Sequence, residues 1–365
     1  MKQILVASNM FPSAQHPTYG IFVKNQVELL RKNGVDVAVI ANSNPNKGKL
    51  NLLRKYGSWF LKYIQHTAVN RKGISAVHAH YIFPTGILAL LSKKIWNIPY
   101  AVTAHGGDLD QMPNKSPLIR KLTALILKNA DEVIVVGEGL KENVQALQEV
   151  PENRLHVISM GVDTDTFKPL AKEGLAVTIS ATENPAVLYV GNIIRAKGLL
   201  ELVEAFKLVQ DQFPTASLNL IGSRKDANFT EQLKNKISDL QLESVHFIDP
   251  QPQEQINQWM NASDILVLPS HIEGFGLVAL EGMAAGIPVV GSEVGGLKYL
   301  LAEKRGVLFE KGNHDMLADS IKAVLVNKEE LIDEEKIRNT VEEHSFNTIV
   351  AKLLRIYKGM GSSND

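Results

Sequence analysis

The chain has 365 residues, of which 45% are hydrophobic, so it is long enough to bury the cores of two domains of ordinary size. It contains no cysteine, which excludes disulfide bonds and thiolate metal sites. No apolar run is long enough to span a bilayer, and the run at residues 4–7 is too short for the core of a signal peptide. We expect a soluble, cytoplasmic protein.

The net charge is zero, but the charges are unevenly distributed along the chain. Residues 1–128 hold 17 Lys and Arg against 4 Asp and Glu, a net charge of +13, whereas residues 171–365 hold 19 against 27, a net charge of −8. Such asymmetry predicts an anionic partner for the first half. Nucleic acid fits poorly, because no recognition-helix or RNA-binding signature accompanies the charge. The basic charge fits better with an anionic, lipid-linked substrate (an acceptor), or with a peripheral position on the inner face of the plasma membrane.

Short apolar runs alternate with segments of helical periodicity along the first half of the chain. Repeated β–α units of this kind are typical of a parallel, doubly wound sheet. The predicted strands are 4–7, 35–40, 76–80, 100–104, 132–136 and 155–158, and the predicted helices are 19–31, 50–66, 85–95, 117–129 and 140–147.

One of these helical segments is basic and amphipathic, with aromatic residues among its apolar positions. Such a segment can lie on an anionic membrane surface, with the aromatic rings inserted at shallow depth. It can equally be a core helix with a solvated basic face, and the sequence leaves both interpretations open. The basic residues are Lys49, Arg54, Lys55 and Lys62, and the apolar ones are Leu50, Leu53, Trp59, Phe60 and Tyr63.

The alternation restarts in the second half, after a segment with turn chemistry at residues 161–169. We therefore predict two Rossmann-like domains, 1–165 and 170–345, facing each other across a cleft that binds ligands at the carboxyl ends of the strands. Two unrelated Rossmann domains in tandem are the alternative. The predicted strands are 186–190, 218–221, 245–248, 265–268, 289–290 and 306–309; the predicted helices are 199–210, 229–240, 253–260, one from 277, and a tail from 316 to 357 broken near Asn327 and Ser345.

The loop that follows residues 265–268 carries the strongest signal for a site. Its two glycines, Gly274 and Gly276, precede a helix, which lets backbone N–H groups point at an anion such as a phosphate. Glu273 lies in the loop, and Glu281 lies about one turn into the helix. Their carboxylates can accept hydrogen bonds from sugar and ribose hydroxyls, so the pattern predicts a nucleotide-sugar site.

A second glycine loop, GNIIRAKG at residues 191–198, follows the strand at 186–190. It carries Lys197, whose ammonium can offset negative charge on a departing phosphate. The alternative interpretation is a solvated lysine at a helix N-terminus.

The segment from Pro269 to Gly296 resembles the signature of the family-4 retaining glycosyltransferases, which have the GT-B fold. The motifs FPSAQHPTYGIFV, HAHYIFPTG, TAHGGD and GNIIRAKG are most similar to the members that build teichuronic acid and exopolysaccharides. The resemblance implies transfer of a sugar, by default from a UDP-sugar, to a hydroxyl of a cell-surface glycan or lipid-linked acceptor. It also implies that the first domain binds the acceptor, the second binds the nucleotide-sugar donor, and a C-terminal helix at 346–358 packs back on the first.

The resemblance assigns roles to individual residues. This chain departs from the family pattern at two positions. The family usually has an arginine where Asn192 stands, and Arg195 could replace that arginine; the family often has a second glycine where Tyr19 stands. The catalytic residues it implies are His105, Lys197 and Glu273; the donor-binding residues are Gly191, Asn192, Arg195, Lys197, Gly222, Gly274, Phe275, Gly276, Leu277 and Glu281; the acceptor-side residues are Gly20 and Asp108.

Neither a cofactor nor a metal ion is expected. The two Asp-x-Asp sequences, which begin at Asp108 and Asp163, do not follow apolar strands and are interpreted as turns. His78, His80 and His105 could form a metal trio, but sheet-edge histidines are the simpler interpretation. Two other functions stay open: a non-hydrolysing nucleotide-sugar epimerase, which needs carboxylates placed for proton removal, and an inactive scaffold that binds nucleotide sugar.

Overall fold

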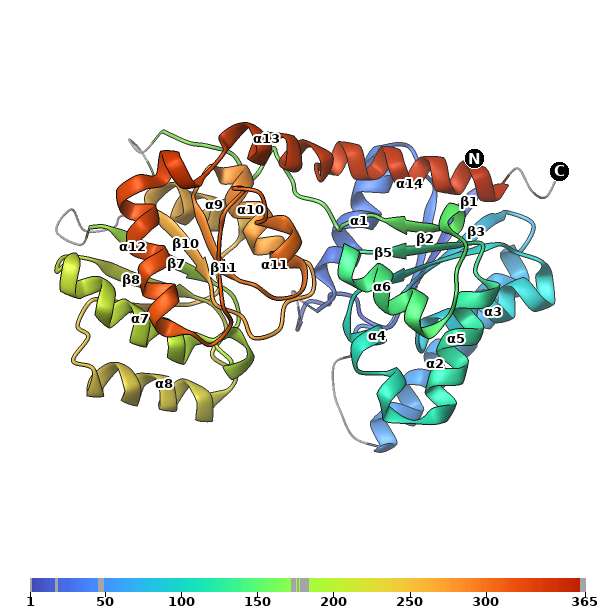
Figure 1. The fold of residues 1–365 in the computed structure, drawn as a ribbon. Helices are drawn as coiled ribbons and strands as arrows, with labels where there is room; N and C mark the ends of the chain where they lie inside the picture. The colour runs from blue at the N-terminus through green and yellow to red at the C-terminus, as the bar shows by residue number, and fades with distance from the viewer. Residues whose placement is uncertain are drawn as a thin grey trace. The chain divides into compact units, whose positions relative to one another are not determined.

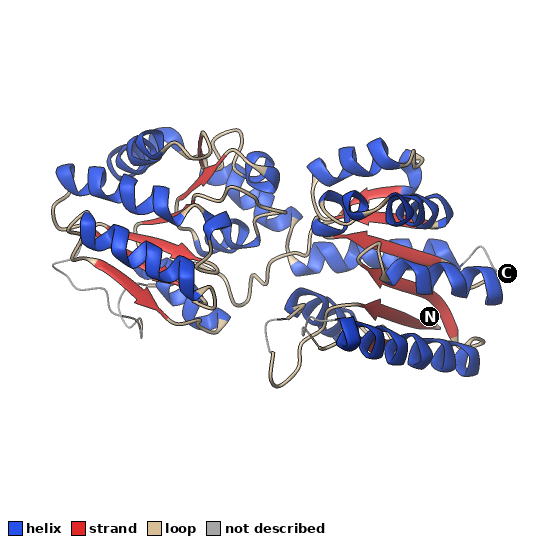
Figure 2. Cartoon of the chain, turned by 90° about the horizontal axis from the view of Figure 1, so that it is seen from below, coloured by secondary structure: helices blue, strands red, loops and turns tan. Residues whose placement is uncertain are grey.

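In the computed structural model, which describes residues 2–16, 19–44, 49–171, 175, 177 and 184–361, the chain forms two compact units. The first consists of residues 1–160 and 346–365, and the second of residues 161–345. Each unit contains a six-stranded parallel sheet with helices on both faces (Figures 1 and 2). The predicted α/β class with two Rossmann-like domains is therefore confirmed.

The strand order in the first unit is β2-β1-β3-β4-β5-β6. The chain moves outward from β1 to β2, returns to β3 on the other side of β1, and continues in that direction. The elements in chain order are β1 (Gln3–Ser8), α1 (Ile21–Lys32), β2 (Val37–Ala41), α2 (Lys49–Asn70), β3 (Ile74–His80), α3 (Thr85–Trp96), β4 (Tyr100–Ala104), α4 (Gly107–Asp110), α5 (Pro117–Asn129), β5 (Glu132–Val135), α6 (Glu138–Leu147) and β6 (Leu155–Val157).

The predicted strands of the first unit are all present, with ends shifted by no more than two residues. The largest difference is at the end of α2, which continues to Asn70. Its buried stripe runs from Trp59 through Tyr63 to Thr67, and the polar Thr67 hides the continuation from an apolar pattern. The hydroxyl of Thr67 donates to the carbonyl of Tyr63 at 2.8 Å, which satisfies it inside the helix.

Trp59 and Tyr63 are core residues, so for these two rings the core interpretation is correct and the insertion into a membrane is wrong. Trp59 is 5% exposed and donates from Nε1 to the carbonyl of Ile40 at 3.0 Å. Tyr63 is fully buried, with its hydroxyl 2.7 Å from Oγ of Ser92. The side chains of Lys49, Leu50, Leu53, Arg54 and Lys55 lie outside the described residues, whereas Phe60 and Lys62 are exposed.

The C-terminal helix α14 (Phe346–Gly361) belongs to the core of the first unit. Its buried residues pack with those of β1, β3 and α1. Near its end, Tyr357 is completely buried and its hydroxyl lies 2.6 Å from Nδ1 of His78 on β3. The last helix of the chain is therefore tied to a central strand of the first sheet. Its core residues are Ile349, Val350, Leu353, Ile356, Tyr357 and Met360.

The strand order in the second unit is β12-β11-β10-β7-β8-β9. Residues 161–169 pack onto this unit, because Val162 and Phe167 lie in its core. The elements are β7 (Ala186–Val190), α7 (Leu199–Gln212), β8 (Ser217–Ile221), α8 (Ala227–Asp239), β9 (Val245–Ile248), α9 (Gln253–Ala262), β10 (Ile265–Leu268), α10 (Leu277–Ala285), β11 (Val289–Ser292), α11 (Gly295–Leu300), β12 (Val307–Phe309), α12 (His314–Leu331) and α13 (Glu334–Glu343).

The helical tail is interrupted at one place more than the sequence predicts. The backbone at Asn327 is non-helical, as expected, and α14 begins after Ser345. A further break at Ile332–Asp333 separates α12 from α13. Oδ1 of Asp333 accepts the N–H groups of Glu335 and Lys336 at 3.1 Å each, so a capping aspartate explains the extra helix start.

Within the part of the chain that the structure describes, no helix combines the length and the apolar character that are needed to cross a membrane.

Candidate active site

The second sheet reverses its direction of growth between β7 and β10. At the carboxyl ends of these two strands, the loops that follow them contact each other. The N–H of His271 donates to the carbonyl of Ala196 at 2.9 Å. Gly198 allows this approach, because a Cβ at that position would lie 1.9 Å from the carbonyl oxygen of Pro269. Ligands of open α/β sheets bind beyond the carboxyl ends of the strands at such a reversal.

The joined loops bring Lys197 and Glu273 together. Nζ of Lys197 donates to Oε2 of Glu273 at 2.7 Å, and both side chains are partly buried. Glu273 is also held by Oγ of Ser270 at 3.4 Å and by the N–H of Gly274 at 3.2 Å. The ammonium and carboxylate named from sequence, 76 residues apart, therefore form one ion pair at the sheet reversal.

The loop carrying Glu273 leads directly into α10 and rests on the start of α11. Gly276 is the N-cap of α10 and has a left-handed backbone, with φ of 94°. A Cβ at Gly295 would lie 1.8 Å from the carbonyl oxygen of Glu273, so only glycine lets α11 support the loop so closely. The first N–H groups of α10, from Leu277 onward, form a partially positive end that suits an anion.

Glu281 lies on α10 and differs from its predicted state. We expect an ionised acceptor from sequence, but burial raises its pKa to about 8, and a hydrogen bond from Gln253 acts in the opposite direction. Its side chain is half-buried, so it keeps access to a ligand. At neutral pH and without a ligand, the carboxyl of Glu281 is mostly protonated.

Four other residues named for the donor fall into two groups. Gly191, Asn192 and Gly222 lie just beyond the carboxyl ends of β7 and β8, at the same edge of the sheet as Lys197. Arg195 is turned toward α8, where its guanidinium donates to Gln232 and lies over the ring of Phe229 at 5.7 Å. In this conformation the guanidinium of Arg195 contacts α8.

In the first unit, His105 is the residue that follows β4, and three rings surround it. Its ring centroid lies 4.9 Å from that of Phe22, 4.6 Å from that of Tyr81 and 5.3 Å from that of His80. Nε2 of His105 lies 3.1 Å from Nδ1 of His80. Burial lowers the pKa of His105 to about 3, so the imidazole is neutral at physiological pH.

Asp108 supports the loop that carries His105 and does not face outward. It is 2% exposed, and its carboxylate accepts the N–H groups of Ile82, His105 and Gly106 at 2.8 to 3.0 Å. Burial raises its pKa to about 6, and these backbone hydrogen bonds oppose the rise. Gly20, the other residue named for the acceptor side, is the left-handed N-cap of α1.

His78 and His80 lie on β3, in the interior of the sheet, so the expectation of sheet-edge histidines is wrong. Both ring nitrogens of His78 are occupied: Nδ1 lies 2.6 Å from the hydroxyl of Tyr357 and Nε2 lies 2.7 Å from Oγ1 of Thr103. Among the described residues, no group of three His, Asp or Glu side chains is arranged to hold a metal ion.

At the other Asp-x-Asp sequence, Asp163 closes a turn by accepting the N–H of Asp165 at 3.0 Å.

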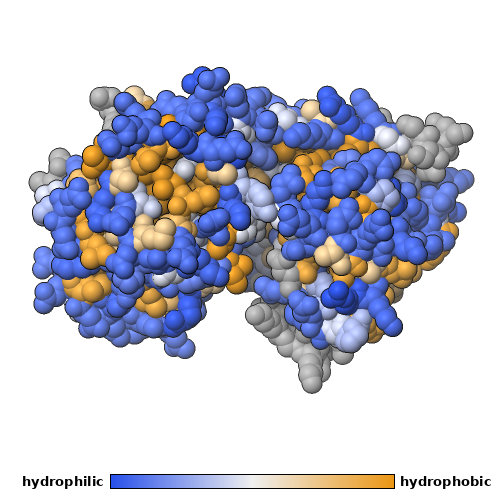
Figure 3. Space-filling view, in the orientation of Figure 1, coloured by the Kyte–Doolittle hydropathy of each residue, from blue (hydrophilic) through white to orange (hydrophobic). Residues whose placement is uncertain are grey.

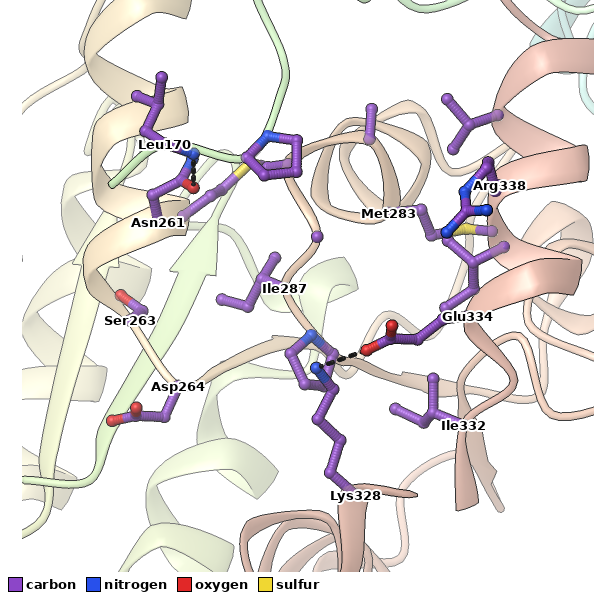
Figure 4. Close-up of a pocket in the computed structure, with 18 residues that line it drawn as sticks. Leu170, Asn261, Ser263, Asp264, Met283, Ile287, Lys328, Ile332, Glu334 and Arg338 are labelled. Atoms are coloured by element: carbon purple, nitrogen blue, oxygen red, sulfur yellow. Dashed lines mark hydrogen bonds and ion pairs between the residues drawn. The ribbon is translucent and has the colours of Figure 1, made fainter. Parts of the chain in front are cut away.

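A pocket of about 630 Å³ lies at the opposite, amino-terminal edge of the second sheet (Figure 4). Asp264 and Pro288, which directly precede β10 and β11, line it, and an ion pair of 3.2 Å between Lys328 and Glu334 spans one side. In the space-filling view, apolar side chains gather on this unit where Figure 1 draws α10 and α12. None of the residues predicted for the donor site lines this pocket.

Comparison with known proteins identifies the family. A model of Glycosyltransferase Family 4 matches residues 20–166, and a model of Glycosyl transferases group 1 matches residues 175–343. An uncharacterized glycosyltransferase of Methanocaldococcus jannaschii is 31% identical over 277 residues, which cover 76% of this chain and 70% of that protein. The chain belongs to the family-4 glycosyltransferases. The resemblance stated from sequence is thereby confirmed.

Two further relatives extend the comparison. A putative teichuronic acid biosynthesis glycosyltransferase of Bacillus subtilis is 26% identical over 360 residues, 87% of this glycosyltransferase and 88% of that protein. The HepE protein of Anabaena, solved in complex with UDP, is 18% identical and superposes with a TM-score of 0.79, covering 98% of this chain and 100% of the other. The superposition supports the GT-B fold for this chain.

Sequence reasoning does not single out Ser270, Gly198 or Gly295, although all three shape the site. Ser270 contacts Glu273, and the two glycines permit the backbone approaches described above. Each lies inside a motif used for the resemblance, so the signal was present. Its meaning depends on contacts between loops distant in sequence, which no local pattern reveals.

Proposed function

We propose that the protein is a retaining hexosyltransferase that moves a sugar from a UDP-sugar to a hydroxyl of a cell-surface glycan or lipid-linked acceptor. The observation that carries this proposal is the Lys197–Glu273 ion pair at the sheet reversal, beside the N-terminus of α10. A cation, a helix N-terminus and a carboxylate in one place suit a diphosphate joined to a polyhydroxylated sugar.

The ion pair suggests how the donor would be received. The diphosphate takes the place of Glu273 as the partner of Lys197, and the released carboxylate of Glu273 accepts hydrogen bonds from sugar hydroxyls. As the bond between the sugar and the phosphate breaks, negative charge grows on the diphosphate. Lys197 and the first N–H groups of α10 stabilise that charge without reorganisation of water.

Three finer parts of the proposal have separate support. Retention of configuration follows the family-4 pattern that contains Glu273 and Glu281. The choice of UDP as the nucleotide agrees with the HepE protein of Anabaena, whose structure was solved in complex with UDP. A cell-surface acceptor agrees with the relative named for teichuronic acid biosynthesis.

Lys197→Ala should lower turnover about 100-fold, because it removes a cation that acts mainly in the transition state. Steady-state kinetics with saturating donor measures this, and Lys197→Arg should recover part of the loss. Lys234→Ala, which removes an exposed lysine on α8, serves as the control.

We also propose that the reaction needs no metal ion, because Lys197 and the N-terminus of α10 offset the charge of the diphosphate. Turnover should therefore continue in the presence of a chelator. Strong inhibition that a divalent ion reverses would overturn this proposal.

Nucleotide affinity should rise with pH through about 8 if the ribose hydroxyls donate to Glu281. The hydroxyls donate to the ionised carboxylate. Because the pKa of Glu281 is raised to about 8 without ligand, nucleotide binding below this pH must release a proton from Glu281. The affinity for UDP should therefore increase about tenfold between pH 7 and 9. Glu281→Gln cannot titrate and should show a weaker, flat affinity over the same range. Equal pH dependence in both proteins, measured by calorimetry, would remove Glu281 from the ribose site.

We also propose that the basic first unit works at an anionic membrane surface, through α5 in place of the rings on α2. Leu118 and Leu125 of α5 are 66% and 45% exposed, and Arg120, Lys121 and Lys128 are exposed on the same helix. No acidic residue occurs in α5. Exposed leucines interleaved with cations suit shallow insertion and attraction to anionic lipid.

The triple variant Arg120→Glu, Lys121→Glu, Lys128→Glu should lose binding to phosphatidylcholine vesicles that contain about one third phosphatidylglycerol, because each basic residue near such a surface contributes about 1 kcal/mol. The control, Lys32→Glu, Arg71→Glu, Lys72→Glu, makes the same charge change at other exposed positions of the first unit. Sedimentation at low salt measures both. Equal loss in the two variants would favour a diffuse charge effect, and no binding of the wild type would end the membrane proposal.

A further inference from the structure

His80, at the carboxyl end of β3, has an unusual hydrogen-bond arrangement. It is completely buried, and its ring stacks on that of His78 with 4.4 Å between centroids. Nδ1 lies 3.1 Å from Nε2 of His105. Nε2 of His80 is buried without a hydrogen-bond partner among the described residues. The one hydrogen bond of this side chain therefore goes to His105.

The direction of that hydrogen bond can be inferred. Burial holds the pKa of His80 well below its ordinary value and that of His105 at about 3, so each ring is neutral and carries one proton. If His80 accepted from His105, its own proton would lie on the buried Nε2 without an acceptor. Orphaned buried N–H groups are rarer than under-satisfied acceptors. His80 therefore donates from Nδ1, His105 accepts at Nε2, and the proton of His105 lies on Nδ1.

We propose that His80 is a positioning residue that fixes His105 in the Nδ1-protonated tautomer, so that His105 presents an N–H donor to its ligand. Nδ1 of His105 has no hydrogen-bond partner in the part of the chain that the structure describes, and the side chain is only half-buried. Phe22 and Tyr81 hold the ring in place. The proposal rests on the proposed function, together with the catalytic role that the resemblance implies for His105, in which an oxygen of the substrate accepts this hydrogen bond.

Nitrogen-15 NMR of the full chain, labelled at histidine, tests the tautomer directly, because the long-range proton–nitrogen pattern of a neutral ring shows which nitrogen carries the proton. The spectrum of a His105→Gln variant assigns the signal. We expect His105 to be protonated at Nδ1 in the wild type. Protonation at Nε2 overturns the proposal, and this measurement needs no variant of His80 to fold.

Two substitutions then test whether His80 is the cause. His80→Phe keeps a ring that can stack on His78 but removes the hydrogen bond, and His105 should revert to protonation at Nε2. His80→Asn offers an amide near the position of Nδ1 and should restore the wild-type pattern. His156, which pairs with Glu132 in the same unit, is the internal control and should not change. An unchanged His105 signal in His80→Phe would contradict the proposal.

Activity provides a separate readout. His80→Phe should lower turnover about tenfold, the size expected for one lost hydrogen bond, with His80→Asn closer to the wild type. If His105→Ala leaves turnover intact, the catalytic role of His105 fails, whereas the tautomer result stands on its own. A normal turnover in His80→Phe, together with a strong loss in His105→Ala, would show that the tautomer does not matter for the reaction.

Discussion

The candidate site depends on one backbone contact, the meeting of the loops that follow β7 and β10. The hydrogen bond from His271 to Ala196 and the close approach of Gly198 to Pro269 join these loops. The contact places an ammonium beside a carboxylate where the sheet reverses its direction. Each charge lowers the cost of partly burying the other, which stabilises the ion pair in the unliganded protein.

Hydrophobic alternation was enough to predict most of the fold. Strands such as β4 and β10 are short apolar runs bounded by polar or turn residues, and the structure has them where the pattern puts them. The pattern failed where a polar residue continued a buried stripe, as Thr67 does in α2, or started a helix, as Asp333 does in α13. It also left the environment of Trp59 and Tyr63 undecided, because an aromatic residue beside lysines can face either the core or a membrane surface.

The site was predictable in its residue types but not in its states. Motif spacing named Lys197, Glu273 and Glu281, yet no spacing reveals that the first two form an ion pair or that burial keeps Glu281 protonated near neutral pH. Likewise, the resemblance named His105 as catalytic and Asp108 as an acceptor-side residue. Only the structure gives Asp108 a supporting role, through N–H groups from two loops. Protonation and hydrogen-bond direction depend on burial, which arises from the whole fold.

Hydrogen exchange of the full chain with and without saturating UDP, followed by mass spectrometry, tests most directly whether the carboxyl edge of the second sheet binds the donor. A rise in the thermal midpoint of the protein on addition of UDP would establish that UDP binds the native state. The account predicts slower exchange in residues 191–198 and 269–281, with little change in the segment of the amino-edge pocket at residues 328–341. Protection confined to that pocket segment, or no protection of either loop at saturation, would contradict it.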